Sequence, residues 1–447
     1  MKYPLVVILV TGVALRLAVF SVSPPSNSYD NHLEAVAMHM EALKTGIRVD
    51  PWECWECYQP PLYYWVASGV AHLSSFILND FGTWKLVQSL SFFASCLTLF
   101  LTAAALLLLL PRREHRPALY VCLTLFAVLP RAIYSSAMTT NDAFLEASVA
   151  IALVGYLTLS RRDKQDGLGL ILIMVGTLVA CWVKQSGLIL TAPLIILLLI
   201  TIFGWWKPYV TVAKQLVIAS LVLVLFFAGI DEAWRYSRTG IFLVSNQQYY
   251  SHAITQLPGS LSEISFLSLR ISPLLENVFM EEQTLSSFWT ELLARFWFDY
   301  ERRFFPVNSI TLAIGRVAYV FGAFVTFLTA IATAIFVVRK PFNAEKGILL
   351  LLAAGFFATP ILQTLRFPYY SSMKAVFALP GLPALLCLAG LGIALGLHLR
   401  PLALLAKITI AVALLLGFLH IVFLVAFSSE AWLDGLSGPL WPLPVLR

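Results

Sequence analysis

The residues best suited to chemistry in this sequence are a few acids and cations that stand at the edges of long apolar segments. The acids are Asp30, just after the first apolar run, and Asp142, in the stretch TTNDAFLEA (139–147). A carboxylate in a half-dry pocket at a membrane edge has a raised proton affinity, which suits it to act as a general base. Cations in the same region can hold an anionic group such as a phosphate. The cations are Lys184, Arg366 and Lys374, with Arg131 and Lys85 as weaker candidates.

Each of these residues also has a structural explanation. Asp30 falls in the first turn of a predicted helix, where the helix dipole stabilises a carboxylate by about 0.3–1 kcal/mol. Asp142 is a possible N-cap of the helix that follows it, and cations at helix ends can extend their charged tips toward water. A lysine in a short turn between two apolar spans, such as Lys184, is costly unless it is paired or used, so it is a functional candidate.

The composition predicts the element that positions these residues, a bundle of membrane-spanning helices. Hydrophobic residues make up 59% of the 447 and charged residues only 12%, and the mean hydropathy is +0.82. Soluble domains carry about 25% charge. A run of about eighteen apolar residues is long enough to cross the bilayer as a helix. The sequence therefore predicts an all-α polytopic membrane protein, a single membrane-embedded domain over 1–447, and no nucleic-acid partner.

About eleven spans follow from the apolar runs. Their approximate bounds are 4–23, 83–110, 117–135, 143–160, 168–183, 187–205, 214–231, 310–338, 347–364, 375–397 and 406–427. The first run contains Arg16 and is read as a retained helix rather than a secretory signal. We expect Arg16 to pair with an acid, as intramembrane charges usually do.

Basic residues predict how the bundle is oriented. They concentrate in one set of short loops, at Arg112, Arg113, Arg116, Arg161, Arg162, Lys164, Lys207, Lys214, Arg339, Lys340, Lys346, Arg400 and Lys407. By the positive-inside rule these loops face the cytoplasm. The two long loops, 24–82 and 231–309, then lie outside, together with Asp30, Asp142 and Lys184.

Both long outer loops contain predicted interfacial helices. In 29–45 apolar residues recur on one face, which is typical of a helix lying in the membrane interface. A second apolar helix starts at Pro60-Pro61. We expect it to be interfacial, because a crossing here would place every later basic loop outside. Residues 287–305 (SFWTELLARFWFDYERRFF) have helical periodicity and predict a third, surface-lying helix.

The stretch between the first two interfacial helices contains Cys54 and Cys57. This C-x-x-C lies on the predicted outer, oxidising side, so it is either a local disulfide or two free thiols. Zinc would need four ligands, and there is no second cysteine pair. We assign no metal ligands and no required cofactor, although nearby acids leave a divalent cation possible.

Several stretches, taken in order, carry a resemblance to a known family. Asp30 is followed by QPPLYYW (59–65), TTNDAFLEA (139–147), GTLVACWVKQSGLIL (176–190) and KAVFALPGLPALL (374–386). Together they resemble the membrane-embedded GT-C glycosyltransferases, specifically glycosyltransferase family 39, the protein O-mannosyltransferase and aminoarabinose-transferase branch. The resemblance covers the whole chain and is weakest over 231–309. Lys374 and Val376 stand where the family more often has Arg-Tyr.

The resemblance implies a GT-C-like bundle that transfers a sugar on the outer side of the membrane. The donor would be a polyprenyl-phosphate-linked sugar, and the acceptor a hydroxyl of a protein, lipid or glycan. Asp30 is the first choice for the general base, and Asp142 would position the acceptor or sugar or share that role. Lys184, Arg366 and Lys374 would bind the donor phosphate. Secondary candidates are His32, Glu34, Tyr63 and Gln59.

The expected location is a bacterial inner (plasma) membrane, with the active site facing the periplasm or exterior. The main alternative is a transporter or flippase, which predicts inverted repeats that are not visible in the sequence. A non-catalytic scaffold subunit is a second alternative, and it would need neither Asp30 nor Lys184.

Overall fold

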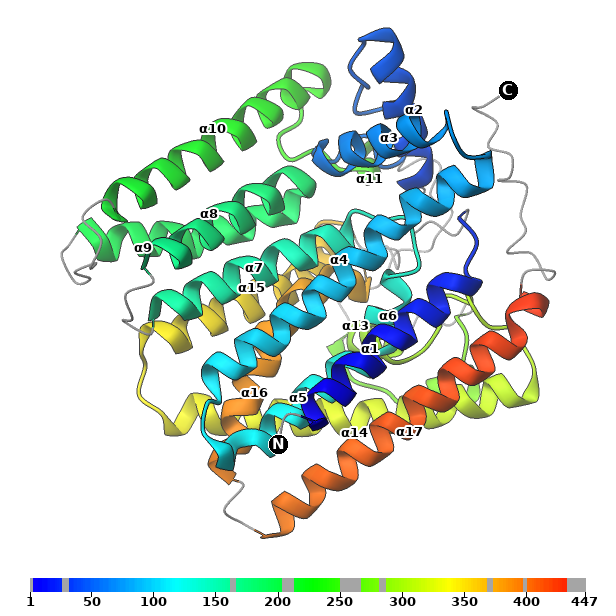
Figure 1. Cartoon of the computed structure of the whole chain (residues 1–447), viewed down its shortest axis with the longest axis vertical. Coiled ribbons are helices and arrows are strands. Elements are labelled where there is room, and N and C mark those ends of the chain that lie inside the picture. The colour runs from blue at the N-terminus through cyan, green and yellow to red at the C-terminus, as the bar shows by residue number, and fades with distance from the viewer. Residues whose placement is uncertain are drawn as a thin grey trace.

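The structure is a computed structural model, and its described part consists of helices packed into one bundle (Figure 1). The described residues are 3–25, 32–160, 166–202, 213–249, 267–280, 287–367, 373–396 and 400–431. The helices of the first half are α1 (Tyr3–Val22), α2 (His32–Thr45), α3 (Leu62–Ser74), α4 (Asp80–Leu109), η1 (Arg113–His115), α5 (Arg116–Val128), α6 (Pro130–Ser135), α7 (Asp142–Ser160), α8 (Asp166–Val183), η2 (Gln185–Leu190) and α9 (Thr191–Ile202). Those of the second half are α10 (Ala213–Thr239), α11 (Asn246–Tyr249), α12 (Ser272–Glu276), α13 (Phe288–Trp297), α14 (Ser309–Arg339), α15 (Ala344–Arg366), η5 (Ala375–Phe377), η6 (Leu379–Gly381), α16 (Leu382–Gly396) and α17 (Arg400–Ala431).

Each predicted span corresponds to one helix or to consecutive helices. Within the described ranges, six helices are long and apolar enough to cross a membrane, and shorter apolar helices accompany them. The predicted span 117–135 is divided at Leu129, because Pro130 disfavours helical geometry in the residue before it. The prediction of an all-α, multi-pass membrane protein is confirmed.

Helices α7 and α8 pack so closely that their backbones touch, and glycines make this possible. A methyl group on Gly176 would lie 2.6 Å from the Ser148 carbonyl oxygen and 2.7 Å from the Ala152 nitrogen. Gly155 and Gly169 face each other farther along the same contact. Small residues at facing positions are the usual means by which membrane helices come together. This contact sets the register between the start of α7 and the end of α8.

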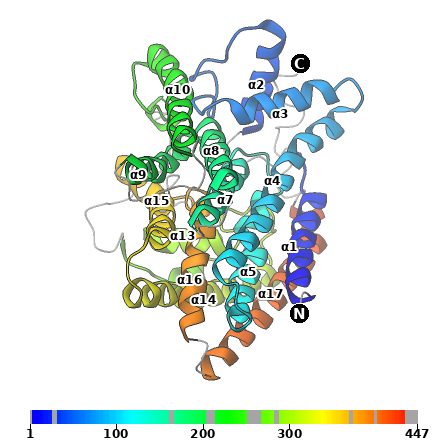
Figure 2. The same cartoon turned by 60° about the vertical axis from the view of Figure 1, so that its left-hand side comes forward.

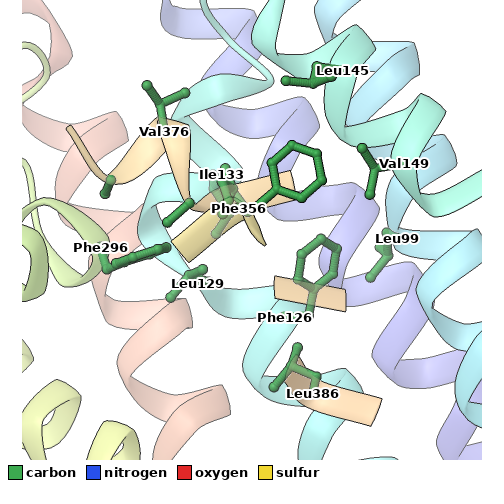
Figure 3. Close-up of a cluster of buried hydrophobic side chains, with 14 of the residues drawn as sticks. Leu99, Phe126, Leu129, Ile133, Leu145, Val149, Phe296, Phe356, Val376 and Leu386 are labelled. Carbon is green, nitrogen blue, oxygen red and sulfur yellow. The ribbon is translucent and has the colours of Figure 1, made fainter. Parts of the chain in front are cut away.

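A shared hydrophobic core holds the remaining helices around this pair. Figure 3 shows side chains from α4, α5, α7, α15 and α16 meeting in the interior, among them Leu99, Phe126, Val149, Phe356 and Leu386. All five are buried. These side chains form one hydrophobic core shared by the spans.

Helices α2 and α3 lie together at one end of the bundle, against α4 and α8 (Figures 1 and 2). The 13 residues of α3 extend only about 20 Å at 1.5 Å per residue. This length is too short to cross a hydrocarbon core of roughly 30 Å. Helix α3 therefore adds no further crossing, as the charge pattern predicted. We call this end, which also carries the start of α7, the Asp142 end.

Helix α13 forms where the sequence predicted, but it is not surface-lying. Every residue of α13 except Trp289 is buried. Helices α6 and α14 pack against it, and the Trp297 ring occupies the space beside Gly322, where a methyl group would lie 2.2 Å from the ring. The prediction of a surface helix was wrong. The helical periodicity of the sequence reveals an apolar face, but it does not reveal whether other helices cover the polar face.

Replacing Gly176 tests the α7–α8 contact. Gly176→Ala is expected to lower the thermal unfolding midpoint, because the added methyl group meets backbone atoms at 2.6–2.7 Å and overpacking costs about 1–3 kcal/mol. The control is Gly229→Ala in α10, whose added methyl group meets nothing within 4 Å. The midpoint is measured in detergent by fluorescence-detected size-exclusion chromatography. Equal midpoints for the two variants would contradict this account of the contact.

His39 gives the packing of α2 on α3 a pH dependence. Its buried ring stacks on Tyr64 with the ring centroids 5.1 Å apart, and Nδ1 donates to the Ala35 carbonyl oxygen at 2.8 Å. Burial lowers the pKa of His39 from 6.5 to about 4, although the bond to Ala35 opposes this shift. As the pH falls from about 6.5 to about 4, the unfolded chain binds a proton at His39 that the folded protein does not bind. Stability is therefore lost as the pH falls, by on the order of 3 kcal/mol.

His39→Phe is expected to flatten this part of the stability–pH curve, because phenylalanine retains a ring against Tyr64 and does not titrate. Thermal midpoints measured between about pH 7 and pH 4 check this expectation. His72→Phe, on the half-buried face of α3, is the matched histidine-to-phenylalanine control and is measured over the same pH range. If His39→Phe and the wild-type protein have the same slope, His39 is not the group responsible.

Candidate functional site

The centre of the candidate site is an ion pair between Asp142 and Lys184. The Lys184 Nζ donates to Asp142 Oδ1 at 2.5 Å, and both side chains are buried. Thr140 Oγ1 donates to the other carboxylate oxygen at 2.9 Å. Both oxygens of Asp142 therefore accept a hydrogen bond. The contact joins two of the residues that the sequence singled out, 42 positions apart in the chain.

The local chain geometry holds the two partners in place. Asp142 is the first residue of α7, and Lys184 lies in the turn between α8 and η2. The Asn141 side chain donates to the Val183 carbonyl oxygen at 3.2 Å, which ties the two chain segments together. Gly187 lets η2 fold back on α8, because a methyl group there would lie 2.1 Å from the Ala180 carbonyl oxygen. The pair therefore depends on the same close packing that joins α7 and α8.

His32 and Tyr63 lie beside the pair. The His32 ring packs edge-on to Tyr63, and its Nδ1 is hydrogen-bonded to the Tyr64 hydroxyl at 2.8 Å. Tyr63 in turn packs against Phe144, in the first turn of α7. Burial, with a smaller effect from the Asp142 carboxylate, raises the pKa of the Tyr63 phenol, so the phenol stays protonated and able to donate. An electrostatic interaction also links His32 with Asp142.

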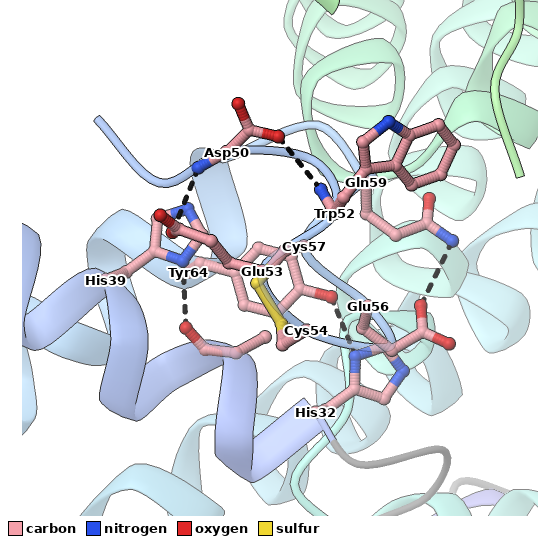
Figure 4. Close-up of a disulfide and its surroundings, with 11 residues drawn as sticks. His32, His39, Asp50, Trp52, Glu53, Cys54, Glu56, Cys57, Gln59 and Tyr64 are labelled. Carbon is pink, nitrogen blue, oxygen red and sulfur yellow. Dashed lines mark hydrogen bonds between the residues drawn. A yellow bond between two sulfur atoms is a disulfide. The ribbon is translucent and has the colours of Figure 1, made fainter. Parts of the chain in front are cut away.

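Gln59 lies in the stretch that joins α2 to α3, residues 51–61, which we call the disulfide elbow (Figure 4). Cys54 and Cys57 form a disulfide there, with their sulfur atoms 1.98 Å apart. Gln59 is buried and donates to Glu56 at 3.3 Å and to the Tyr58 hydroxyl at 2.6 Å. Its described contacts are thus within the elbow, while the elbow as a whole places Tyr63 and Tyr64 at the site.

The two other acidic candidates are Asp30 and Glu34. Asp30 lies outside the described residues. Glu34 is half-buried on the first turn of α2, and burial raises the pKa of its carboxyl. Among the described residues, Glu34 has no ion-pair partner.

The two remaining predicted cations occupy different environments. Arg366, at the exposed end of α15, donates to the Leu243 carbonyl oxygen at 3.3 Å. Lys374 is half-buried and directly precedes η5. The ring of Phe377, in the same turn as Lys374, has its centroid 5.1 Å from the Lys184 Nζ. The described contacts therefore link both cations to the surroundings of the Asp142–Lys184 pair. Lys374 is linked through Phe377. Arg366 is linked through Leu243, because the next residue, Val244, accepts a hydrogen bond from Gln185 at 2.9 Å.

The structure contains a second cluster of charged residues, which the sequence indicated only weakly. Arg295 forms ion pairs with Glu291, at 3.5 Å, and with Glu301, and Glu301 also lies 3.7 Å from Arg131. The spacing of Glu291 and Arg295, four residues apart on a helix, is the one local signal that could have indicated a pair. An electrostatic interaction links Glu301 with Lys374, so this cluster adjoins the Lys374 turn.

An apolar cavity of about 380 Å³ lies beside this cluster. Its walls come from α5, α13, α14, α15 and α16, and Leu129, Leu293 and Phe296 are among the lining residues. Leu129 is two positions from Arg131, and Leu293 and Phe296 flank Arg295. A smaller cavity of about 140 Å³ shares Leu125 and Val325 with it. The apolar space thus extends along α5 and α14.

The described ranges contain no ready-made cluster of metal ligands. No three His, Cys, Asp or Glu side chains come together there as possible ligands. The two Asp142 oxygens accept hydrogen bonds from Lys184 and Thr140.

Comparison with known proteins gives matches in structure. No protein-family model matches the sequence, and no curated protein matches it. The apo oligosaccharyltransferase of Archaeoglobus fulgidus superposes with a TM-score of 0.52 at 12% identity, over 96% of this chain and 56% of its own. Its complex with Zn and sulfate gives 0.53 at 11% identity, over 94% and 53%. ArnT from Cupriavidus metallidurans bound to undecaprenyl phosphate gives 0.49 at 14% identity, over 98% and 73%.

The match to the archaeal oligosaccharyltransferase is one of fold, because identity is low throughout. This chain spans just over half the length of that enzyme, 53–56% of it. Nearly the whole chain takes part in the superposition. The chain therefore shares the fold of the part of the archaeal oligosaccharyltransferase on which it superposes.

Proposed function

We propose that this protein is a glycosyltransferase that moves a hexosyl or pentosyl group from a polyprenyl-phosphate-linked donor to an acceptor hydroxyl. The acceptor belongs to a protein, a lipid or a glycan. The reaction takes place at the Asp142 end, which we place on the periplasmic or outer side of a bacterial inner membrane. The whole chain acts as one membrane-embedded domain.

One observation carries this proposal: a buried acid and a buried lysine meet at one end of a GT-C bundle. The archaeal enzyme with this fold is an oligosaccharyltransferase, so the fold is suited to sugar transfer at a membrane. Asp142 and Lys184 also lie in two of the four stretches whose sequence resembles the family's motifs. A pair this costly to bury is commonly retained for chemistry.

The chemistry of sugar transfer assigns a role to each of the two acids, Asp30 and Asp142. The acceptor hydroxyl gives its proton to a carboxylate while its oxygen forms a bond to the anomeric carbon of the sugar. The bond from that carbon to the phosphate oxygen breaks, and the electron pair leaves with the phosphate. We assign the proton to Asp30, and to Asp142 the positioning of the acceptor or sugar or a share of the base role.

Lys184 is suited to stabilise the departing phosphate. Its ammonium group has three N–H donors, and the bond to Asp142 uses one of them. A cation held beforehand where negative charge develops lowers the barrier most effectively. We assign Lys374 and Arg366 to the same phosphate, with Lys374 the more important because its turn adjoins Lys184. His32, Glu34, Tyr63 and Gln59 form the surrounding wall.

The apolar cavity fits the lipid part of the donor. It is lined almost entirely by hydrophobic side chains, among them Leu129, Leu293 and Phe296, which stand within two positions of Arg131 or Arg295 in the chain. An isoprenoid chain needs an apolar space of this kind. The cavity therefore favours a polyprenyl-linked donor over a soluble sugar nucleotide.

A transfer assay tests the proposed function. The purified full chain in liposomes is offered a panel of polyprenyl-phosphate sugars with hydroxyl acceptors, and mass spectrometry identifies the products. Asp142→Asn and Lys184→Met are each expected to lower turnover by about 10²-fold or more, because general-base and phosphate-stabilising groups contribute at that scale. Asp30→Asn should lose at least tenfold.

Two controls separate chemistry from folding. Breaking a buried pair costs about 3–5 kcal/mol of stability, so the double variant Asp142→Asn/Lys184→Gln is included, since it removes both charges together. It should fold and remain inactive. Glu41→Gln removes one partner of an exposed pair with Lys44 at 3.0 Å and should retain wild-type turnover. Full activity in the Asp142 and Lys184 variants, or movement of lipid without any sugar transfer, would overturn the proposal.

A further inference from the structure

Arg16 is a fully buried arginine in the first span, and the structure does not place an acid against it. Its Nε donates to Ser95 Oγ at 2.9 Å, and Nη1 donates to the carbonyl oxygens of Gly12 and Ala127 at 3.0 and 3.1 Å. Its Nη2 has no hydrogen-bond partner in the described part of the chain. The predicted direct pairing with an acid is therefore not what is found, since no carboxylate oxygen of a described residue lies within 4.0 Å of Arg16.

Glu146, on α7, is a buried acid whose charge type is complementary to that of Arg16. It is 1% exposed, and neither of its carboxylate oxygens has a hydrogen-bond partner among the described residues. It stands four positions after Asp142, which places it one helical turn from the candidate site on the same face of α7. The mechanism proposed above does not use it.

Packing brings Glu146 and Arg16 to the same region of the interior. Ala94, next to the Arg16 partner Ser95, belongs to one small buried cluster with Ala143 and Ala147, and Ala147 is next to Glu146. Helices α4 and α7 are in extensive contact there. An electrostatic interaction between Arg16 and Glu146 agrees with this placement. The other charged groups near Glu146 are already paired, Lys184 with Asp142 and Arg131 with Glu301.

A buried guanidinium and a buried carboxylate each carry a large desolvation cost unless they are hydrogen-bonded and neutralised. Both groups here have open hydrogen-bonding positions, and they lie near each other without direct contact. Buried water commonly bridges such groups and makes about three hydrogen bonds to them. We propose that Arg16 and Glu146 form a water-bridged pair, and that Glu146 is a positioning residue holding the start of α7, and Asp142 with it, against α1 and α4.

The positioning role rests on the proposed function, while the pair itself does not. Because Asp142 and Glu146 share one turn of α7, loss of the bridge is expected to let that turn shift. A displacement of about 1 Å at a reacting group can lower the rate about 10²-fold. The pair and its effect on turnover therefore need separate measurements.

A double-mutant cycle on stability tests the pair without any substrate. Thermal midpoints of the full chain in detergent are measured for Glu146→Gln, Arg16→Gln and the double variant. Each single variant should lower the midpoint, and the double should lower it by clearly less than the sum, because the second change removes a group that the first had already left without its partner. The matched control is Arg112 with Glu114, an exposed pair at 3.4 Å, whose Arg112→Gln and Glu114→Gln effects should be additive. Additive effects at Arg16 and Glu146 would overturn the pair.

A second comparison covers the case in which Arg16→Gln does not accumulate. Glu146→Asp, which retains the carboxyl group, should keep most of the wild-type midpoint, while Glu146→Gln and Glu146→Leu should not. If all three variants unfold at the wild-type temperature, the pair is overturned by this route as well.

Turnover with the most active donor of the panel tests the positioning role. Glu146→Gln is expected to lower kcat about tenfold with KM for the donor unchanged, and Glu146→Asp should restore part of the loss. If the cycle shows coupling but kcat is unchanged in Glu146→Gln, the pair stands and the positioning role is overturned. If the wild-type protein transfers no sugar from any donor, the proposed function fails, and the stability cycle still decides whether the pair exists.

Discussion

The arrangement of this protein depends on the high cost of placing charges where water is scarce. Asp142 and Lys184 are both buried at the end of an apolar bundle, and neither could remain there ionised without the other. They meet because α7 and α8 approach until their backbones touch at Gly155, Gly169 and Gly176. Close helix packing and charge pairing are therefore one structural feature, and the register of the helices decides whether the charges meet.

The same constraint explains how the rest of the Asp142 end is built. Segments far apart in the chain, from α2, α3, α7, the α8–η2 turn and η5, converge on the Asp142–Lys184 pair. Beyond it, Glu301 links Arg131 with Arg295, and sequence neighbours of these arginines, Leu129, Leu293 and Phe296, line the apolar cavity. A site that joins a charged rim to an apolar interior is suited to a ligand with a phosphate and a hydrocarbon chain. This physical match supports the proposal of a lipid-linked donor.

Much of the fold was predictable because membrane insertion is decided locally. A run of about twenty apolar residues specifies a spanning helix whatever its neighbours are, and every predicted span corresponds to helical structure. Asp142 and Lys184 were singled out by the cost of a polar group at an apolar edge, which is also a local property. The contact between them was not predictable, because it depends on glycines that lie up to about 30 residues away and on which faces of α7 and α8 meet.

Three features could not be predicted from the sequence. The apolar face of 287–305 predicted a helix correctly, but only the position of α14 and α6 over α13 decided that it is buried. Arg16 was expected to contact an acid, but Ser95 and two carbonyl oxygens take its place. Arg366 and Lys374 flank one segment of sequence, and the fold gives them different surroundings. Hydropathy and charge, which act over a few residues, determined the spans and the candidate residues. The tertiary structure decided which of them touch, because contacts between helices depend on long-range register that no short stretch of sequence contains.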